Sequence, residues 1–146
     1  CNLASVALSK FVDIKNKKFE FEKLYEVVQI ITENLNNVID YNFYPVPETE
    51  TSNRRHRPIG IGVQGLADVF AKLRISFDSE EAINISRKIA EYMYLASCEA
   101  SMDIARKRKR YVQEYRRLLK KEDEVYFDND NKEKSTDQLR LKRNKK

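Results

Sequence analysis

Residues 19–40 carry the clearest hydrophobic pattern in the chain. Polar residues separate apolar positions that recur at the i, i+3, i+4, i+7 spacing of one helix face: Leu24, Val27, Val28, Ile31, Leu35, Val38 and Ile39. This spacing predicts an amphipathic helix with one buried face. The helix must end before Pro45, because proline lacks an amide proton and restricts the residue before it.

A second patterned region runs from residue 59 to about residue 120. The β-branched residues 59–63 follow Pro58 and predict a short, buried, glycine-rich strand. Residues 64–73 turn to helical spacing. A long helix should begin after Asp78 or Ser79, whose side chains suit an N-cap. Its apolar stripe ends at Ala105 and consists of Ile83, Ile89, Met93, Ala96, Ala100 and Ile104.

The remaining segments are less regular. Residues 1–14 mix the strand and helix periods, so the pattern leaves strand and short helix open. Residues 42–58 hold all three prolines and predict a loop. From residue 122 onward the chain is so polar that we expect disorder. The fragment should therefore be mainly α-helical, with one short strand and a basic tail that is first helical and then disordered.

Charge changes this picture only in the tail. The net charge is +5, but the bases gather in residues 106–121 and at the C-terminus. Such a run can bind nucleic acid or act as a nuclear address, whereas a solvated helix is the simpler interpretation, and we expect no nucleic-acid partner. No window is long and apolar enough to span a membrane, and no signal peptide opens the chain. We expect a cytoplasmic protein without a membrane partner.

The three glycines, Gly60, Gly62 and Gly65, spell G-x-G-x-x-G between a predicted strand and a predicted helix. This order superficially matches a dinucleotide-binding turn. No further βαβ unit follows, however, and Val63 and Gln64 would occupy the place of the pyrophosphate. Close packing of a neighbouring backbone against the glycines is the interpretation that we prefer.

The cluster Arg54-Arg55-His56-Arg57 holds the only histidine of the chain. Neighbouring positive charge opposes an imidazolium, and no second histidine or nearby cysteine completes a metal site. The arginines could hold carboxylates or phosphates in bidentate fashion, and ion pairs that pack the loop are the simpler expectation. We predict no bound metal and no bound cofactor.

The two cysteines differ in context. Cys98 falls beside Leu95 and Met102 in the long predicted helix, which suggests a buried, inert thiol. Cys1 has no local context that reveals a role. Two cysteines without a C-x-x-C motif do not make a disulfide framework.

Several stretches resemble the large, catalytic subunit of eukaryotic-type class I ribonucleotide reductases. The run SNRRHRPIGIGVQGLAD at residues 52–68 is the most specific of them. The match also includes residues 1–8, 34–40, 44–48, 99–101 and 103–105, in the same order as in the family, and covers about residues 1–105. After Ala105 the family usually continues with Gly-Pro, and here a basic run replaces it.

The resemblance implies a fold and a chemistry. It implies that residues 1–105 are part of a ten-stranded α/β barrel and that residues 106–146 are a divergent basic tail. In the family a thiyl radical abstracts a ribose hydrogen, and a cysteine pair supplies electrons for the reduction of ribonucleoside diphosphates to DNA precursors. Cys1 stands at the position of the second cysteine of that pair, so the resemblance implies that it is a redox thiol whose partner belongs to an absent segment.

The family's radical cysteine, effector-binding region and substrate-phosphate loop are also absent, so this internal piece should be inactive alone. The resemblance implies three partners. They are a small subunit, thioredoxin or glutaredoxin, and a second large subunit. The metal centre of the small subunit generates the radical. A non-catalytic remnant or pseudogene product is the main alternative. A basic nucleic-acid-binding helical protein is the other.

Overall fold

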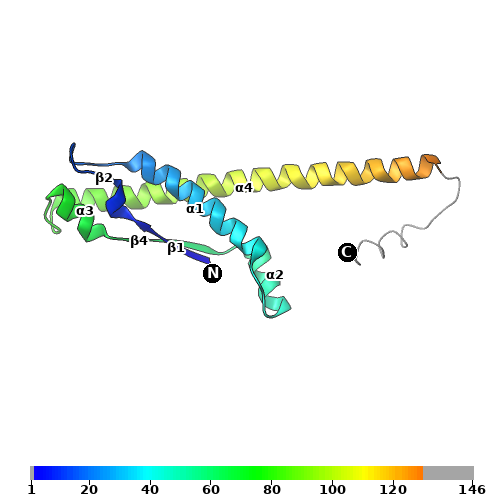
Figure 1. Ribbon diagram of the computed structural model, residues 1–146, viewed down its shortest axis with the longest axis horizontal. Helices are drawn as coiled ribbons and strands as arrows, with labels where there is room; N and C mark the ends of the chain where they lie inside the picture. The colour runs from blue at the N-terminus through cyan, green and yellow to red at the C-terminus, as the bar shows by residue number, and fades with distance from the viewer. Residues whose placement is uncertain (1, 130–146) are drawn as a thin grey trace. The chain divides into compact units, whose positions relative to one another are not determined.

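The computed structural model describes the backbone of residues 2–129 and the side chains of residues 2–117. The elements in chain order (Figure 1) are β1 (Asn2–Ala7), a 3-10 turn η1 (Leu8–Phe11), β2 (Val12–Asp13), β3 (Lys18–Phe19), α1 (Phe21–Tyr41), α2 (Pro47–His56), β4 (Ile59–Gln64), α3 (Leu66–Leu73) and α4 (Glu80–Asn129). The chain divides into two units, Cys1–Ala105 and Arg106–Lys146.

β1 and β4 form a parallel pair, although more than fifty residues separate them in the sequence. Their register runs from Asn2 opposite Ile59 to Ala7 opposite Gln64. Parallel neighbours cannot be joined by a tight turn, so a crossover is required. α1 and α2 lie within that crossover. The mixed pattern thus resolves, over residues 2–13, into a strand, a 3-10 turn and the first strand of a small β2–β3 hairpin.

One hydrophobic core joins the first unit. It brings together buried residues from β1, η1, β3, α1, α3 and the first part of α4: Val6, Leu8, Phe11, Phe19, Leu24, Val28, Val69, Phe70, Leu73, Ala82, Ile89, Met93 and Ala96. Burial of this much apolar surface is the main favourable contribution to folding. The core therefore holds the strand pair and these helices together.

The helices predicted from hydrophobic spacing are confirmed. α1 buries Leu24, Val28, Leu35 and Ile39, and only Val38 of the predicted stripe is largely exposed. α4 begins where an N-cap was expected. The Ser79 hydroxyl accepts a hydrogen bond from the Ala82 N–H at 3.2 Å, which satisfies one of the free donors of the first turn.

The loop predicted for residues 42–58 is wrong, because most of it is α2. Pro47 occupies the first turn of this helix, where its missing N–H costs nothing. Glu48 and Glu50 lie at the positive end of α2, and Arg54, Arg55 and His56 lie at the negative end. α2 buries no residue, so the hydrophobic pattern held no signal for it.

The disorder predicted from residue 122 is also wrong as far as Asn129, where α4 ends. Residues 80–129 contain neither glycine nor proline and are rich in good helix formers. High charge therefore does not interrupt the helix. Residues 130–146 lie outside the described part, and so does the prediction made for them.

Two further findings bear on the expected architecture. The described residues are mainly helical, and their four strands make two separate two-stranded sheets, so this part of the chain closes no barrel. No helix within it is apolar over a long enough stretch to cross a membrane.

The Arg57 side chain ties the start of β4 to α1. Its guanidinium binds the Asp40 carboxylate through two hydrogen bonds of 3.0 and 2.8 Å, and it donates to the Asn36 side chain and carbonyl, each at 2.6 Å. The Arg57 backbone is left-handed (φ 48°), and its N–H closes α2 on the Asn53 carbonyl. We call Arg57, Asp40 and Asn36 the arginine clamp. It fixes where α2 ends and β4 begins.

A second polar contact links α1 to α4. The Tyr25 hydroxyl donates a hydrogen bond to the Glu99 carboxylate and accepts one from the Gln29 amide at 3.2 Å. This bond to a carboxylate raises the pKa of Tyr25 above its ordinary value of 10.0, because an ionised phenol could no longer donate. Tyr25 thus joins two helices that lie far apart in the sequence.

Replacement of Arg57 by Ala should lower the free energy of unfolding by about 2 kcal/mol, because charge-assisted hydrogen bonds are removed and the half-buried Asp40 loses its nearest guanidinium. Arg57→Lys should restore only part of it, because an ammonium cannot form the two-pronged contact. Urea unfolding of the chain measures both. Arg55→Ala is the matched control and should change stability by less than about 0.5 kcal/mol. Equal effects at positions 55 and 57 would contradict the clamp.

Tyr25→Phe should destabilise the chain below pH 10.0 and should remove part of its alkaline sensitivity. A pKa raised in the folded state means that the contribution of Tyr25 is complete below pH 10.0 and is lost as the pH rises above that value. Urea unfolding at about pH 8 and about pH 11 should therefore show a larger difference between the two proteins at the lower pH. A difference that grows with pH would refute this role for Tyr25.

Candidate functional site

Cys1, the predicted redox thiol, lies outside the described residues. The strand that follows it is described, and its first residue, Asn2, is paired with Ile59 of β4. The arginine clamp immediately precedes β4 in the sequence. The surroundings of the β1–β4 strand pair are therefore the candidate site.

One face of the strand pair is small and open. Successive side chains of a strand point to opposite faces, so Leu3 and Ser5 of β1 share a face with their register partners Gly60 and Gly62 of β4. A Cβ added at Gly62 would meet the Ser5 hydroxyl at 3.5 Å, an ordinary contact. Leu3 is 74% exposed. With so little side chain in the way, a ligand or another backbone can approach this face closely.

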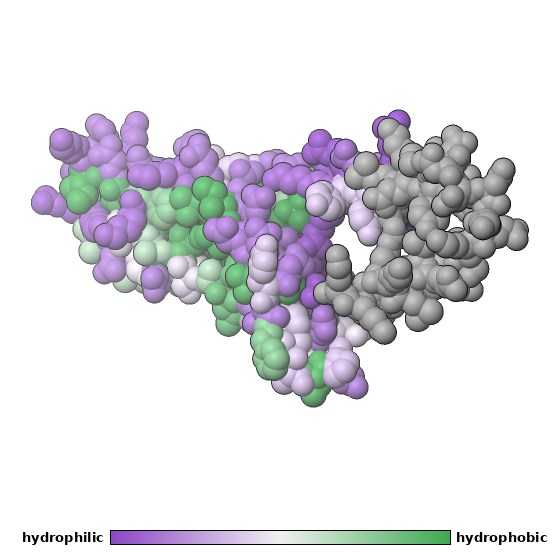
Figure 2. Space-filling model, turned by 45° about the vertical axis from the view of Figure 1, so that its right-hand side comes forward, coloured by the Kyte–Doolittle hydropathy of each residue, from purple (hydrophilic) through white to green (hydrophobic). Residues whose placement is uncertain are grey.

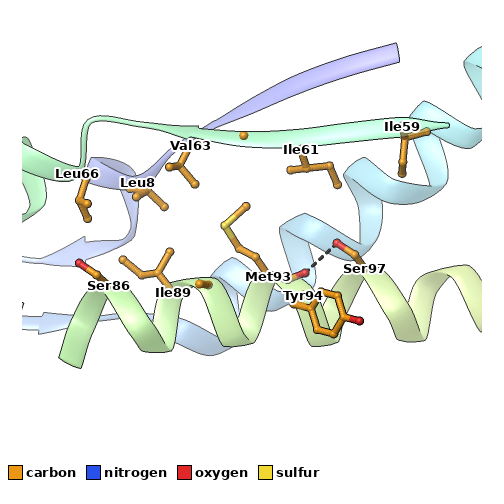
Figure 3. A pocket seen from close by; sticks show the side chains of 12 residues that line it. Leu8, Ile59, Ile61, Val63, Leu66, Ser86, Ile89, Met93, Tyr94 and Ser97 are labelled. Atoms are coloured by element: carbon orange, nitrogen blue, oxygen red, sulfur yellow. Dashed lines mark hydrogen bonds between the residues drawn. The ribbon is translucent and has the colours of Figure 1, made fainter. Parts of the chain in front are cut away.

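The other face of β4 borders an apolar groove of about 480 Å³. Figure 3 shows Ile59, Ile61 and Val63 pointing from β4 toward α4, which contributes Ile89 and Met93 to the groove. Ser86 and Ser97 also line the groove, and their hydroxyls donate to helix carbonyls at 2.8 Å. The groove is therefore a hydrophobic surface with few polar groups to recognise a ligand.

The glycine motif has an acidic neighbour. Gly65 adopts a left-handed backbone (φ 76°) just before α3, and a Cβ there would lie 3.0 Å from the Asp68 carboxylate. Asp68 lies in the first turn of α3, where a dinucleotide-binding turn would receive the pyrophosphate. A carboxylate at this position repels phosphate. These contacts favour the structural interpretation of the glycines.

The basic cluster is divided between structural and exposed residues. Arg57 belongs to the clamp, and Arg54 pairs with Glu50 at 2.7 Å, so the ion-pair interpretation is confirmed for both. Arg55 and His56 are exposed and line a shallow hollow on one side of α2. Among the described residues no group of three or more His, Cys, Asp or Glu side chains is placed to hold a metal ion.

The prediction that Cys98 is buried is wrong, because its side chain is exposed. The buried stripe of α4 contains Met93, Ala96 and Ala100. Cys98 lies two residues from both alanines, which turns it about 200° around the helix axis from each. Leu95 and Met102, which suggested an apolar environment, are themselves half exposed.

Sequence reasoning missed the residues that anchor the site. Asn36 and Asp40 stand one turn apart on α1, and their polar type gave no hint that Arg57 would bind both. Asn36 is one of two buried polar residues in the described part of the chain. A polar residue beside Leu35 on the predicted buried face was the one available signal, because buried polar groups need partners.

Comparison with known proteins identifies the family of this chain. The family model described as "Ribonucleotide reductase, barrel domain" matches residues 1–146. The chain is 56% identical over 105 residues to the ribonucleoside-diphosphate reductase large subunit of Plasmodium falciparum (isolate Dd2), covering 72% of this chain and 13% of that protein.

Two other relatives give similar values. Identity is 50% over 115 residues with the ribonucleoside-diphosphate reductase large chain 2 of Saccharomyces cerevisiae, which covers 76% of this chain and 13% of the relative. It is 56% over 107 residues with the large subunit of Vaccinia virus, which covers 73% and 14%. The chain spans only about an eighth of the length of these relatives. It belongs to the ribonucleotide reductase family and corresponds to part of its barrel domain.

Proposed function

We propose that this chain is part of a ribonucleoside-diphosphate reductase large subunit and carries one thiol of its redox pair, Cys1. The observation that carries the proposal is the identity of 50% to 56% with proteins named as that large subunit, over most of this chain. The enzyme would convert ribonucleoside diphosphates to deoxyribonucleoside diphosphates in the cytoplasm. The net reaction consumes two thiols and yields a disulfide, the deoxynucleotide and water.

The geometry supports a scaffolding role for the described residues. One face of the β1–β4 pair carries small side chains and is open to an approaching ligand. The arginine clamp and the hydrophobic core fix the register of that pair. In this proposal the strand pair holds Cys1 beside the ribose, and the partner cysteine comes from another part of the subunit. The described residues bind no radical cofactor in this scheme, and a metal-containing small subunit generates the radical.

Exposed hydrophobic surface supports packing against further protein. Figure 2 shows hydrophobic patches among hydrophilic ones on one face of the molecule. Large exposed side chains of the first unit include Leu3, Tyr41, Phe43 and Phe77. Single exposed side chains are normal, whereas contiguous apolar surface such as the groove between β4 and α4 is typical of an interface. The remainder of the barrel and a second large subunit are the proposed neighbours. Thioredoxin or glutaredoxin would re-reduce the cysteine pair.

The chain alone should form no deoxynucleotide when it is supplied with a small subunit, a ribonucleoside diphosphate and dithiothreitol, because the family's radical cysteine and substrate-phosphate loop lie in parts of the large subunit that this chain does not span. In a chimera that places residues 1–105 in a complete large subunit, Cys1→Ser should abolish thioredoxin-dependent turnover and leave unfolding unchanged. Product analysis by chromatography measures turnover, and urea unfolding measures stability. Normal turnover by the Cys1→Ser chimera would exclude the role proposed for Cys1, and an inactive parent chimera would argue against the family function of the fragment.

Cys98 supplies the matched control for that experiment. Since its side chain is exposed, Cys98→Ser should change the free energy of unfolding by less than about 0.5 kcal/mol and should leave chimera turnover intact. In the folded chain, Ellman's reagent should modify Cys98 without prior unfolding. A Cys98 that reacts only in urea would contradict its exposed position.

A further inference from the structure

The segment of α4 from residue 106 to residue 117 presents a face made of cations. Arg or Lys fills seven of its twelve positions, and Glu114 is the only acid. All twelve side chains are exposed. Six of them follow the helical spacing i, i+3, i+4, i+7, i+10, i+11, which places them on one side of the helix. We call them the basic stripe: Arg106, Lys109, Arg110, Gln113, Arg116 and Arg117.

The stripe is long, continuous and rigidly spaced. At 1.5 Å per residue it extends for about 16 Å along the helix axis. Within the described residues no ion pair engages Lys109, Arg110, Arg116 or Arg117. The stripe itself contains no carboxylate, and Glu114 stands at its flank, one turn from Arg110 and from Arg117. A partner with repeated negative charge would complement this positive potential.

The other side of the segment is different in kind. Tyr111 and Tyr115 stand one turn apart there and are 79% and 57% exposed, next to Val112. Lys107, Arg108 and Glu114 interrupt this side. It is therefore a small and broken apolar surface, and it does not lie on the basic stripe.

Although the sequence alone led us to expect no nucleic-acid partner, we propose that the basic stripe binds the phosphate backbone of double-stranded nucleic acid. Phosphate contacts by Lys and Arg provide affinity without sequence recognition, and they need no apolar anchor. The stripe has no such anchor, whereas most protein interfaces depend on buried aromatic or apolar side chains. An α-helix, about 10–12 Å across with its side chains, also fits into the major groove, which is about 12 Å wide.

Other occupants match the surface less well. A second copy of the stripe would bring like charges together. A membrane-surface helix needs a wide apolar face of large residues, and here three residues interrupted by charges stand in its place. Single strands gain affinity by stacking bases on aromatic side chains. Tyr111 and Tyr115 point away from the stripe, so one strand could not use both surfaces together.

The test uses the 146-residue chain and a fluorescein-labelled DNA duplex of about 20 base pairs, with fluorescence anisotropy recorded over a series of salt concentrations. Binding should weaken steeply with salt. Arg110→Gln/Arg117→Gln should weaken it about tenfold near 0.15 M salt. The slope of log affinity against log salt should fall by about 2, because each substitution removes one arginine from the phosphate backbone.

The matched control is Lys107→Gln/Arg108→Gln, which removes the same charge from the same helix on the opposite side. It should weaken binding by less than about threefold, because these cations act only through screened long-range attraction. Circular dichroism establishes that both variants keep their helix content. Equal losses in the two variants would overturn the assignment to this face.

Competitors distinguish the remaining partners. An unlabelled duplex should displace the probe at a lower phosphate concentration than a single strand of mixed sequence. It should also outcompete polyglutamate at equal charge and vesicles that contain phosphatidylserine. Preference for polyglutamate would assign the stripe to acidic protein segments, preference for vesicles would assign it to membranes, and no binding of the duplex would refute the proposal.

Discussion

The parallel pairing of β1 with β4 is the constraint on which the first unit depends. Two six-residue strands from distant parts of the sequence must lie side by side, and their register runs from Asn2–Ile59 to Ala7–Gln64. Closing the long loop between the two strands costs conformational entropy, and the hydrogen bonds and contacts of the strand pair must offset that cost. The segment between the strands contributes to stability itself, because α1 packs its apolar face into the same core that contains Val6 of β1. Core burial and strand pairing therefore stabilise each other.

Polar contacts then set the precision of the arrangement. Hydrophobic packing alone tolerates small sliding, whereas the two-pronged contact between Arg57 and Asp40 has one favourable geometry. The clamp acts at the residue where α2 ends and shortly before β4 begins. The hydrogen bond between Tyr25 and Glu99 likewise restricts how α1 packs against α4. Each contact joins elements far apart in the sequence, so each restricts the fold more than a contact within one helix.

α4 combines two different kinds of helix in one continuous element. Its first part contributes Ala82, Ile89, Met93 and Ala96 to the core. From Ala105 to Arg117 every side chain is exposed. Helix propensity and the absence of glycine and proline suffice to continue the backbone, whereas burial of one face stabilises only the first part. The distribution of charge follows this change, since the basic stripe begins where the buried stripe ends.

The sequence by itself determined the elements whose signal is local, and tertiary structure decided the remainder. Hydrophobic spacing predicted α1, α3 and the buried part of α4, and the string at residues 52–68 was enough to identify the family. The ion-pair interpretation of Arg54 and Arg57 was also correct.

The sequence could not specify Asp40 and Asn36 as partners of Arg57, because that contact depends on how α1 and α2 cross. Residues 2–7 became a strand because β4 is available as a neighbour, and no period within the segment carries that information. α2 has no buried face, so its stability comes from charges at its ends and from Pro47 rather than from a pattern of apolar residues. The exposure of Cys98 followed from a rotation of about 200° around α4 that the apolar neighbours Leu95 and Met102 concealed. Local sequence determines which backbone conformation is favourable, whereas only the assembled core determines which face of a helix or strand is buried.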